Sequence, residues 1–106
     1  MRILRFNVEK QRITKQKDCD FSGIVAGSVG YLHAKFYFSE EWNPCVTKIA
    51  RFWNSGNEHS VILDTNNECD IPSEALTTKV FEVSVMGVAP SFRIESNKTK
   101  VRQEVI

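Results

Sequence analysis

The residues that could carry out chemistry in this 106-residue chain do not form a catalytic motif. Serine, histidine and aspartate are all present, yet no G-x-S-x-G turn, H-E-x-x-H pair or glycine-rich phosphate loop occurs. His33 lies on the polar side of an expected strand, and His59 lies in an expected turn. Exposed histidine is the ordinary outcome at both places. We therefore expect a protein that is not an enzyme.

The cysteines and carboxylates also lack the spacing of a metal site. Cys19, Cys45 and Cys69 include no C-x-x-C pair, and two histidines do not complete the usual zinc pattern. The acidic segment 64–74 lacks the residue order of a calcium loop. We expect no metal and no cofactor, and we interpret the cysteines as small buried side chains in a reducing compartment.

Aromatic side chains provide one candidate binding site. Tyr31, Tyr37, Trp42 and Trp53 could stack on sugar rings if they share an exposed face, which would make the protein a carbohydrate-binding β-sandwich. Tyr31 and Tyr37 have the same strand parity, whereas Trp42 follows a turn. The competing interpretation places Trp42 and Phe52 in the core or at its edge.

Charge is distributed unevenly along the chain, although the net charge is only +1. Basic residues dominate the first seventeen residues and the last two dozen, and carboxylates dominate the middle. The basic residues alternate with apolar ones, which is typical of the solvated face of edge strands. A contact with an acidic neighbouring protein is the functional alternative, and nucleic acid is less favoured. The candidate docking residues are Arg2, Arg5, Arg12, Lys15, Lys100 and Arg102.

Short runs with a two-residue alternation must position these side chains. The clearest lies at 32–38, where Leu32, Ala34, Phe36 and Phe38 share one face. Similar strands are expected at 4–9, 47–53, 61–63, 81–86, 92–95 and 100–105, with a polar edge strand or arm at 11–17.

Turn residues separate these runs. Asn54–Asn57 and Asp64–Asn67 contain residues that tolerate tight turns, and the glycines between 23 and 30 favour a loop or a bulged strand. Ser39 can cap a turn at 39–42. Pro72 suits the first position of one helical turn at 72–76, with Ala75 and Leu76 closing the core.

The pattern predicts an all-β fold, because no apolar helical period is sustained and each expected strand has one apolar face to bury. We expect a single domain over residues 1–106: a two-sheet antiparallel β-sandwich, immunoglobulin-like or jelly-roll-like, with the helical turn near 72–76. No apolar run approaches the ~18 residues of a membrane helix, and no signal peptide precedes the first strand. Cytoplasmic synthesis is therefore expected.

Four segments, in this order, resemble the N-terminal domain of baseplate upper or minor tail proteins in phages and prophages of Gram-positive bacteria. They are an aromatic strand ending in Ser-x-x-Trp, an Ala-x-Phe strand, a Cys-x-Ile-Pro segment with an acidic residue, and a strand ending in glycine: Phe38–Trp42, Ala50–Phe52, Cys69–Glu74 and Val83–Gly87. The similarity extends from the opening strand to Val101–Val105. Ser96-Asn97 replaces the Thr-Asn pair that the family often has, and family members usually continue into a linker, helices and a receptor-binding region.

The resemblance implies a structural protein of the phage tail, a baseplate adapter that docks to the distal tail and presents a following host-recognition region. It implies other tail proteins as partners, self-association in the assembled particle, and a place in the virion after synthesis in the bacterial cytoplasm. No membrane is implied. An immunoglobulin-like domain without binding activity of its own is a further alternative. We expect the docking surface on the basic strands at the two ends of the chain, outside the four segments.

Overall fold

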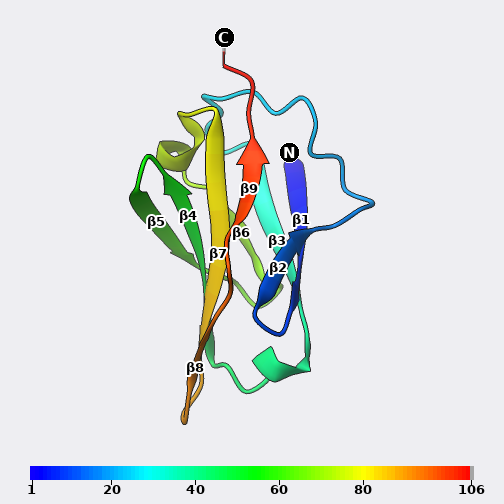
Figure 1. Cartoon of the computed structure of the whole chain (residues 1–106), viewed down its shortest axis with the longest axis vertical. Helices are drawn as coiled ribbons and strands as arrows, with labels where there is room; N and C mark the ends of the chain where they lie inside the picture. Colours follow the sequence, from blue (N-terminus) through cyan, green and yellow to red (C-terminus); the bar gives the residue numbers. More distant parts are fainter. Residues whose placement is uncertain (106) are drawn as a thin grey trace.

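The computed structural model describes residues 1–105 and consists of two β-sheets packed face to face (Figure 1). Of the expected domain, only Ile106 lies outside the described residues. Two short 3-10 helices interrupt the strands. The elements are β1 (Arg2–Glu9), β2 (Arg12–Lys15), β3 (Leu32–Phe38), η1 (Glu40–Trp42), β4 (Thr47–Asn54), β5 (Asn57–Ile62), β6 (Glu68–Asp70), η2 (Ser73–Leu76), β7 (Val80–Val88), β8 (Arg93–Glu95) and β9 (Thr99–Arg102).

The strand order confirms the two-sheet sandwich and adds one parallel pair. The four-stranded sheet has the order β2-β1-β3-β6, and β1 runs parallel to β3. The five-stranded sheet has the order β5-β4-β7, with β8 and β9 pairing successive stretches of the same edge of β7. The parallel pair requires a crossover connection, which residues 10–31 supply through β2 and the glycine-containing segment.

The core follows the alternation of the sequence. Inward residues of the central strands are fully buried: Leu4, Phe6 and Val8 of β1, Leu32, Ala34 and Phe36 of β3, Ala50 and Phe52 of β4, and Phe81, Val83 and Val85 of β7. The Phe6 and Phe36 rings stack across the parallel pair at a centroid distance of 5.3 Å. Full burial of each larger side chain contributes roughly 1.5–3 kcal/mol.

The two expected tight turns are confirmed, but the placement of His59 in a turn is wrong, because β5 begins at Asn57 and His59 pairs with Phe52. Ser55 and Gly56 have φ values of 51° and 80°, so two left-handed residues join β4 to β5, as a two-residue hairpin requires. In the second turn Asn67 has φ 60°, and Asp64 Oδ1 accepts hydrogen bonds from the N–H groups of Asn66 and Glu68. This Asx arrangement replaces backbone bonds that the turn cannot make.

Two details of the expected helical turns are wrong. Pro72 lies at the N-cap of η2 and not at its first position, because its ψ of 133° is still extended. Ser39 makes no capping hydrogen bond to η1; its hydroxyl accepts from the Lys10 N–H and donates to the Glu41 carboxylate. Ala75 and Leu76 are fully buried, as predicted for residues that close the core.

Trp42 of η1 packs against Gly87 of β7. Figure 1 shows the segment of η1 at the end of the sandwich opposite η2. The Trp42 indole is fully buried and its Nε1–H donates to the Lys10 carbonyl at 2.8 Å. A Cβ added at Gly87 would lie 2.6 Å from Cys45 Sγ and 2.9 Å from the Trp42 ring. Only glycine leaves room for the packing of these two side chains.

The last expected strand ends early. β9 stops at Arg102, so that Val101 is buried but Val105 is 53% exposed, contrary to the predicted strand over 100–105. The chain leaves β7 because Glu104 pairs with the crossover segment: its N–H donates to the Ile24 carbonyl, and its own carbonyl accepts from Ala26.

Candidate functional site

Four of the six candidate docking residues are divided between the two outer faces of the sandwich, whereas Arg2 and Lys15 have the strand parity of the buried Leu4 and Ile13. Arg5 alternates with buried residues of β1 and faces outward from the four-stranded sheet, where Arg12 pairs opposite Glu9. Lys100 and Arg102 flank buried Val101 and face outward from the five-stranded sheet. Because these faces point in opposite directions, the predicted basic residues do not form one surface.

Three of these basic side chains are also engaged within the molecule. The Arg2 guanidinium donates to the carbonyls of Asp20 and Ser22, at 2.9 and 2.6 Å. Arg5 Nη1 donates to the Tyr37 hydroxyl at 2.8 Å. Lys15 Nζ lies 5.7 Å from the Phe21 ring centroid. These contacts hold residues 20–22 of the crossover segment against β1 and β2, and β3 against β1.

The predicted aromatic platform does not assemble. Trp42 is 0% exposed, so its assignment as a sugar-facing residue is wrong: its ring fills the space beside Gly87. Tyr31 and Tyr37 are 50% and 40% exposed, and Tyr37 lies on the outer face of the four-stranded sheet. Trp53 lies on the outer face of the five-stranded sheet. Tyr37 and Trp53 therefore face away from each other.

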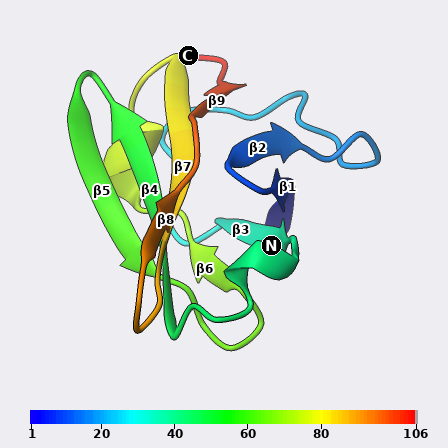
Figure 2. The same ribbon diagram turned by 60° about the horizontal axis from the view of Figure 1, so that its bottom comes forward.

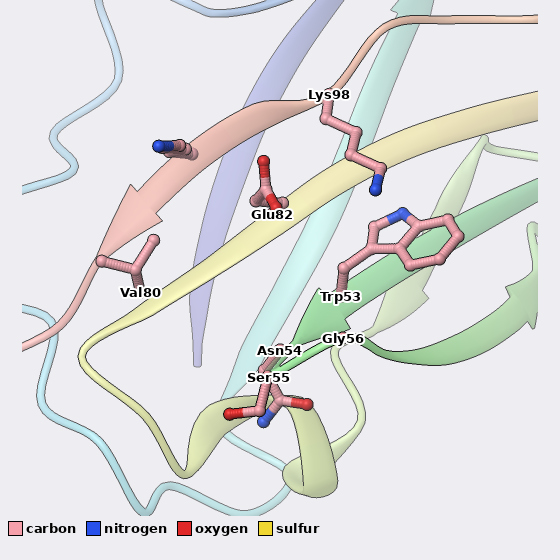
Figure 3. A pocket seen from close by; sticks show the side chains of 8 residues that line it. Trp53, Asn54, Ser55, Gly56, Val80, Glu82 and Lys98 are labelled. Atoms are coloured by element: carbon pink, nitrogen blue, oxygen red, sulfur yellow. The ribbon is translucent and has the colours of Figure 1, made fainter.

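Trp53 lies in a groove of about 390 Å³ on that outer face (Figure 3). Strand register explains the site: Trp53 is the cross-strand partner of Glu82, and Glu82 is the partner of Lys100. The three side chains form a row across β4, β7 and β9. Lining residues from the hairpin turn and the ends of β7 and β9 complete it: Asn54, Ser55, Gly56, Val80 and Lys98.

The Trp53 ring is held by two contacts. Its Nε1–H donates to Ser84 Oγ at 3.0 Å, which fixes the orientation of the indole on the sheet. Lys98 Nζ lies 3.9 Å from the ring centroid, and Figure 3 shows the ammonium directed at the indole. This cation–π contact takes the position over the ring that a stacked sugar would need. The groove thus presents an aromatic edge, two ammonium groups and one carboxylate.

An ion-pair network continues from the groove along the same face. Arg51 contacts Glu58 of β5 at 3.3 Å and Glu95 of β8 at 2.7 Å, and Arg93 contacts the other oxygen of Glu95 at 3.0 Å. Partly exposed pairs of this kind each contribute only about 0–1 kcal/mol to stability. Their main effect is to fix Arg51 next to the half-buried Trp53.

Sequence reasoning missed this face. The alternation of the sequence does place Arg51 and Trp53 on the outer side of one strand, and Glu82 and Ser84 on the outer side of another. Only the register between β4 and β7, which the sequence does not give, places Trp53 beside Glu82 and Arg51 beside Ser84. Of the residues that line the groove, the sequence predicted Trp53 as a sugar-binding residue and Lys100 as a docking residue.

A second hollow, of about 560 Å³, is acidic. Glu9, Ser39, Glu40 and Glu41 line it. The hydrogen bond from the Ser39 hydroxyl lowers the pKa of Glu41 from its ordinary value. Among residues 1–105, no group of three or more histidine, cysteine or acidic side chains is placed to hold a metal ion.

Burial makes Cys69 a weak acid and a poor nucleophile. Desolvation, helped by the negative charges of Asp70 and Asp64, raises the pKa of its thiol to about 12. Cys45 is also buried, Cys19 is half-buried, and all three thiols are free. A neutral thiol does not attack electrophiles or bind metals readily, so the prediction of packed cysteines fits Cys45 and Cys69 best.

Comparison with known proteins identifies no relative: no protein-family model, curated protein or solved structure matches the chain. In the part of the chain that the structure describes, no helix has the length and apolar composition needed to cross a membrane. Function must therefore be inferred from the residues themselves.

Proposed function

We propose that the chain is the β-sandwich adapter domain of a phage or prophage tail, a structural protein that docks to the distal tail and presents a host-recognition region that follows it. One observation supports this most. The four segments that resemble the tail-protein family contribute to one core although they are far apart in sequence: Trp42 packs on Gly87, Phe52 pairs with Val83, and Cys69 is buried in the same core beside Ala34 of β3, which lies outside the segments.

Contact among these segments is what a shared fold requires. The tryptophan of one segment packs against the glycine of another with no room for a Cβ, so both residues have a structural role in one core. The segments supply packing and turns and leave the outer faces free to differ between relatives. In this proposal, docking therefore depends on an outer face and not on the four segments.

We assign docking to the outer face of the five-stranded sheet. Aromatic and arginine side chains are enriched in protein interfaces and contribute most of their binding energy. This face holds Trp53 and Arg51 beside each other on β4, with Lys98 and Lys100 able to meet carboxylates of an acidic partner. The basic residues of β1 and β2 are a weaker candidate, because neither tryptophan of the chain lies on the outer face of their sheet: Trp42 is buried and Trp53 is on the other sheet.

Co-expression with phage tail proteins, a distal-tail protein among them, tests the proposal. We expect the distal-tail protein to co-purify with the tagged chain, and Trp53→Ala to reduce the recovery at least about tenfold, as for a residue central to an interface. Tyr37→Ala, on the opposite face, is the matched control and should leave recovery unchanged. A folded protein that binds none of these partners would exclude the assignment.

Carbohydrate binding remains the second candidate because Trp53 lies in a groove. Lys98 would have to leave the ring to admit a sugar. Tryptophan fluorescence quenched by an oligosaccharide, in wild type and not in Trp53→Ala, would favour this function. The absence of a response across a broad panel of glycans would argue against it.

A further inference from the structure

Strand edges of the two sheets are protected to different degrees. An edge carries unpaired N–H and C=O groups that can pair with another chain. At the β2 edge, Asn97 occupies these groups: its N–H donates to the Gln11 carbonyl at 3.0 Å, and its Oδ1 accepts from the Ile13 N–H at 2.8 Å. β6 at the other edge of this sheet has only three residues and is followed closely by Pro72.

β5 has none of these protections. It is the last strand of the five-stranded sheet, and Figures 1 and 2 show no element beyond it. Its six residues, Asn57–Ile62, contain no proline, lysine, arginine or glycine, and none has a left-handed φ. Ile62 is 68% exposed. The strand is long enough and regular enough to pair.

The hairpin turn determines which groups of β5 are free. Because a two-residue turn makes Asn54 and Asn57 a hydrogen-bonded pair, residues 57, 59 and 61 direct their backbone groups to β4. The next odd residue agrees, since the Leu63 N–H donates to the Lys48 carbonyl at 2.9 Å. Glu58, Ser60 and Ile62 therefore direct their N–H and C=O groups to the open edge.

We infer that β5 pairs antiparallel with β5 of a second copy of the chain, joining two five-stranded sheets into one. A twofold axis at Ser60 places Ser60 opposite Ser60 and Glu58 opposite Ile62, so that all three outward residues exchange about six backbone hydrogen bonds. No carboxylate faces a carboxylate in this register, and the aliphatic part of Glu58 covers the exposed Ile62. The small net charge of +1 opposes association little. The pairing does not depend on the proposed tail function.

Substitutions at Ser60 test the pairing in the purified chain alone. The Ser60 N–H faces the open edge and makes no bond within the molecule, and proline is tolerated at such a position. Ser60→Pro therefore removes only a hydrogen-bond donor that the dimer would use. Ser60→Ala is the matched control, since it keeps that N–H. By sedimentation equilibrium we expect wild type and Ser60→Ala to dimerise, and Ser60→Pro to raise the dissociation constant at least about tenfold.

A second variant and a second measurement guard against misfolding. Ile62→Glu should weaken the dimer similarly without any constraint on the backbone, because it places a carboxylate opposite Glu58 of the second copy, and circular dichroism should show both variants folded. Amide hydrogen exchange should become slower at Glu58, Ser60 and Ile62 as concentration rises, whereas His59 and Val61 should be protected at all concentrations. A monomer at every concentration, a dimer unaffected in both variants, or exchange at these three amides that is independent of concentration would each overturn the inference.

Discussion

Trp42 and Trp53 are the only tryptophans of the chain, and the molecule uses them in opposite ways. Trp42 is fully buried, donates to a backbone carbonyl, and contacts Phe38 and the bare Cα of Gly87. Trp53 is half-buried, donates to the Ser84 hydroxyl, and contacts the ammonium group of Lys98. Substitutions around Trp42 should therefore destabilise the fold, whereas substitutions around Trp53 should mainly alter the outer surface that a binding partner would contact.

Replacing each tryptophan by alanine gives the largest expected contrast. Trp42→Ala opens a core cavity and leaves the Lys10 carbonyl without its partner, so the free energy of unfolding should fall by about 3–5 kcal/mol. Trp53→Ala should cost only about 1–2 kcal/mol, because its ring is partly solvated already. Denaturant unfolding of both variants measures the difference, and equal losses would contradict the division into core and surface.

The buried thiol of Cys69 should make the free energy of unfolding depend on pH in the alkaline range. The pKa of Cys69 rises on folding from 9.0 to about 12, so the neutral thiol is favoured in the folded state. Its contribution is complete below pH 9 and is lost as pH rises towards 12, a fall of roughly 2–4 kcal/mol. Unfolding free energies of wild type and Cys69→Ala, measured from pH 8 to pH 11, should converge. An unchanged difference between them would show that burial does not shift this thiol.

Gly87→Ala should be the next most damaging change, because the new methyl group meets Cys45 Sγ and the Trp42 ring. Overpacking of this kind costs about 1–3 kcal/mol. Removing the sulfur by Cys45→Ala in the same chain should recover part of the loss, so the two substitutions should not be additive in a double-mutant cycle. Strict additivity would mean that the contact exerts no steric restraint.

Lys98→Ala should have the smallest effect. Its ammonium lies over an accessible ring, where a cation–π contact contributes about 0.5–1 kcal/mol. Lys98→Met is the matched control, since it keeps the apolar stem and removes the charge. Tryptophan emission should change in both variants because Trp53 loses the ammonium group over its ring. A loss of stability comparable to that of Trp42→Ala would place Lys98 in the core architecture.

The sequence was sufficient for the inward faces and the turns, because these depend on neighbours along the chain. The alternation of Leu32, Ala34 and Phe36 predicts a buried face whatever the partner strand, and Asn54–Asn57 predicts its turn from backbone preferences alone. The same alternation cannot tell a parallel from an antiparallel partner. For that reason, the β1–β3 pairing was not predicted.

Residues of the candidate site depended on distances that the sequence does not contain. Trp42 follows an exposed turn, and its burial depends on the absence of a side chain at Gly87. The groove depends on a register that aligns Trp53 with Glu82 and Glu82 with Lys100. Residues with ordinary local patterns can thus form either core or recognition surface, according to which strand lies beside them.

The parallel pairing of β1 and β3 also affects the order in which the chain folds. The β4–β5 hairpin closes through two residues and can form in about 1–10 μs. By contrast, β1 meets β3 only after the connection of residues 10–31 has closed, and sheets dominated by such distant pairs fold in milliseconds to seconds. The apolar face of β1 therefore waits longer for its β3 neighbour than β4 waits for β5, and while it waits it can attach to other unfolded chains.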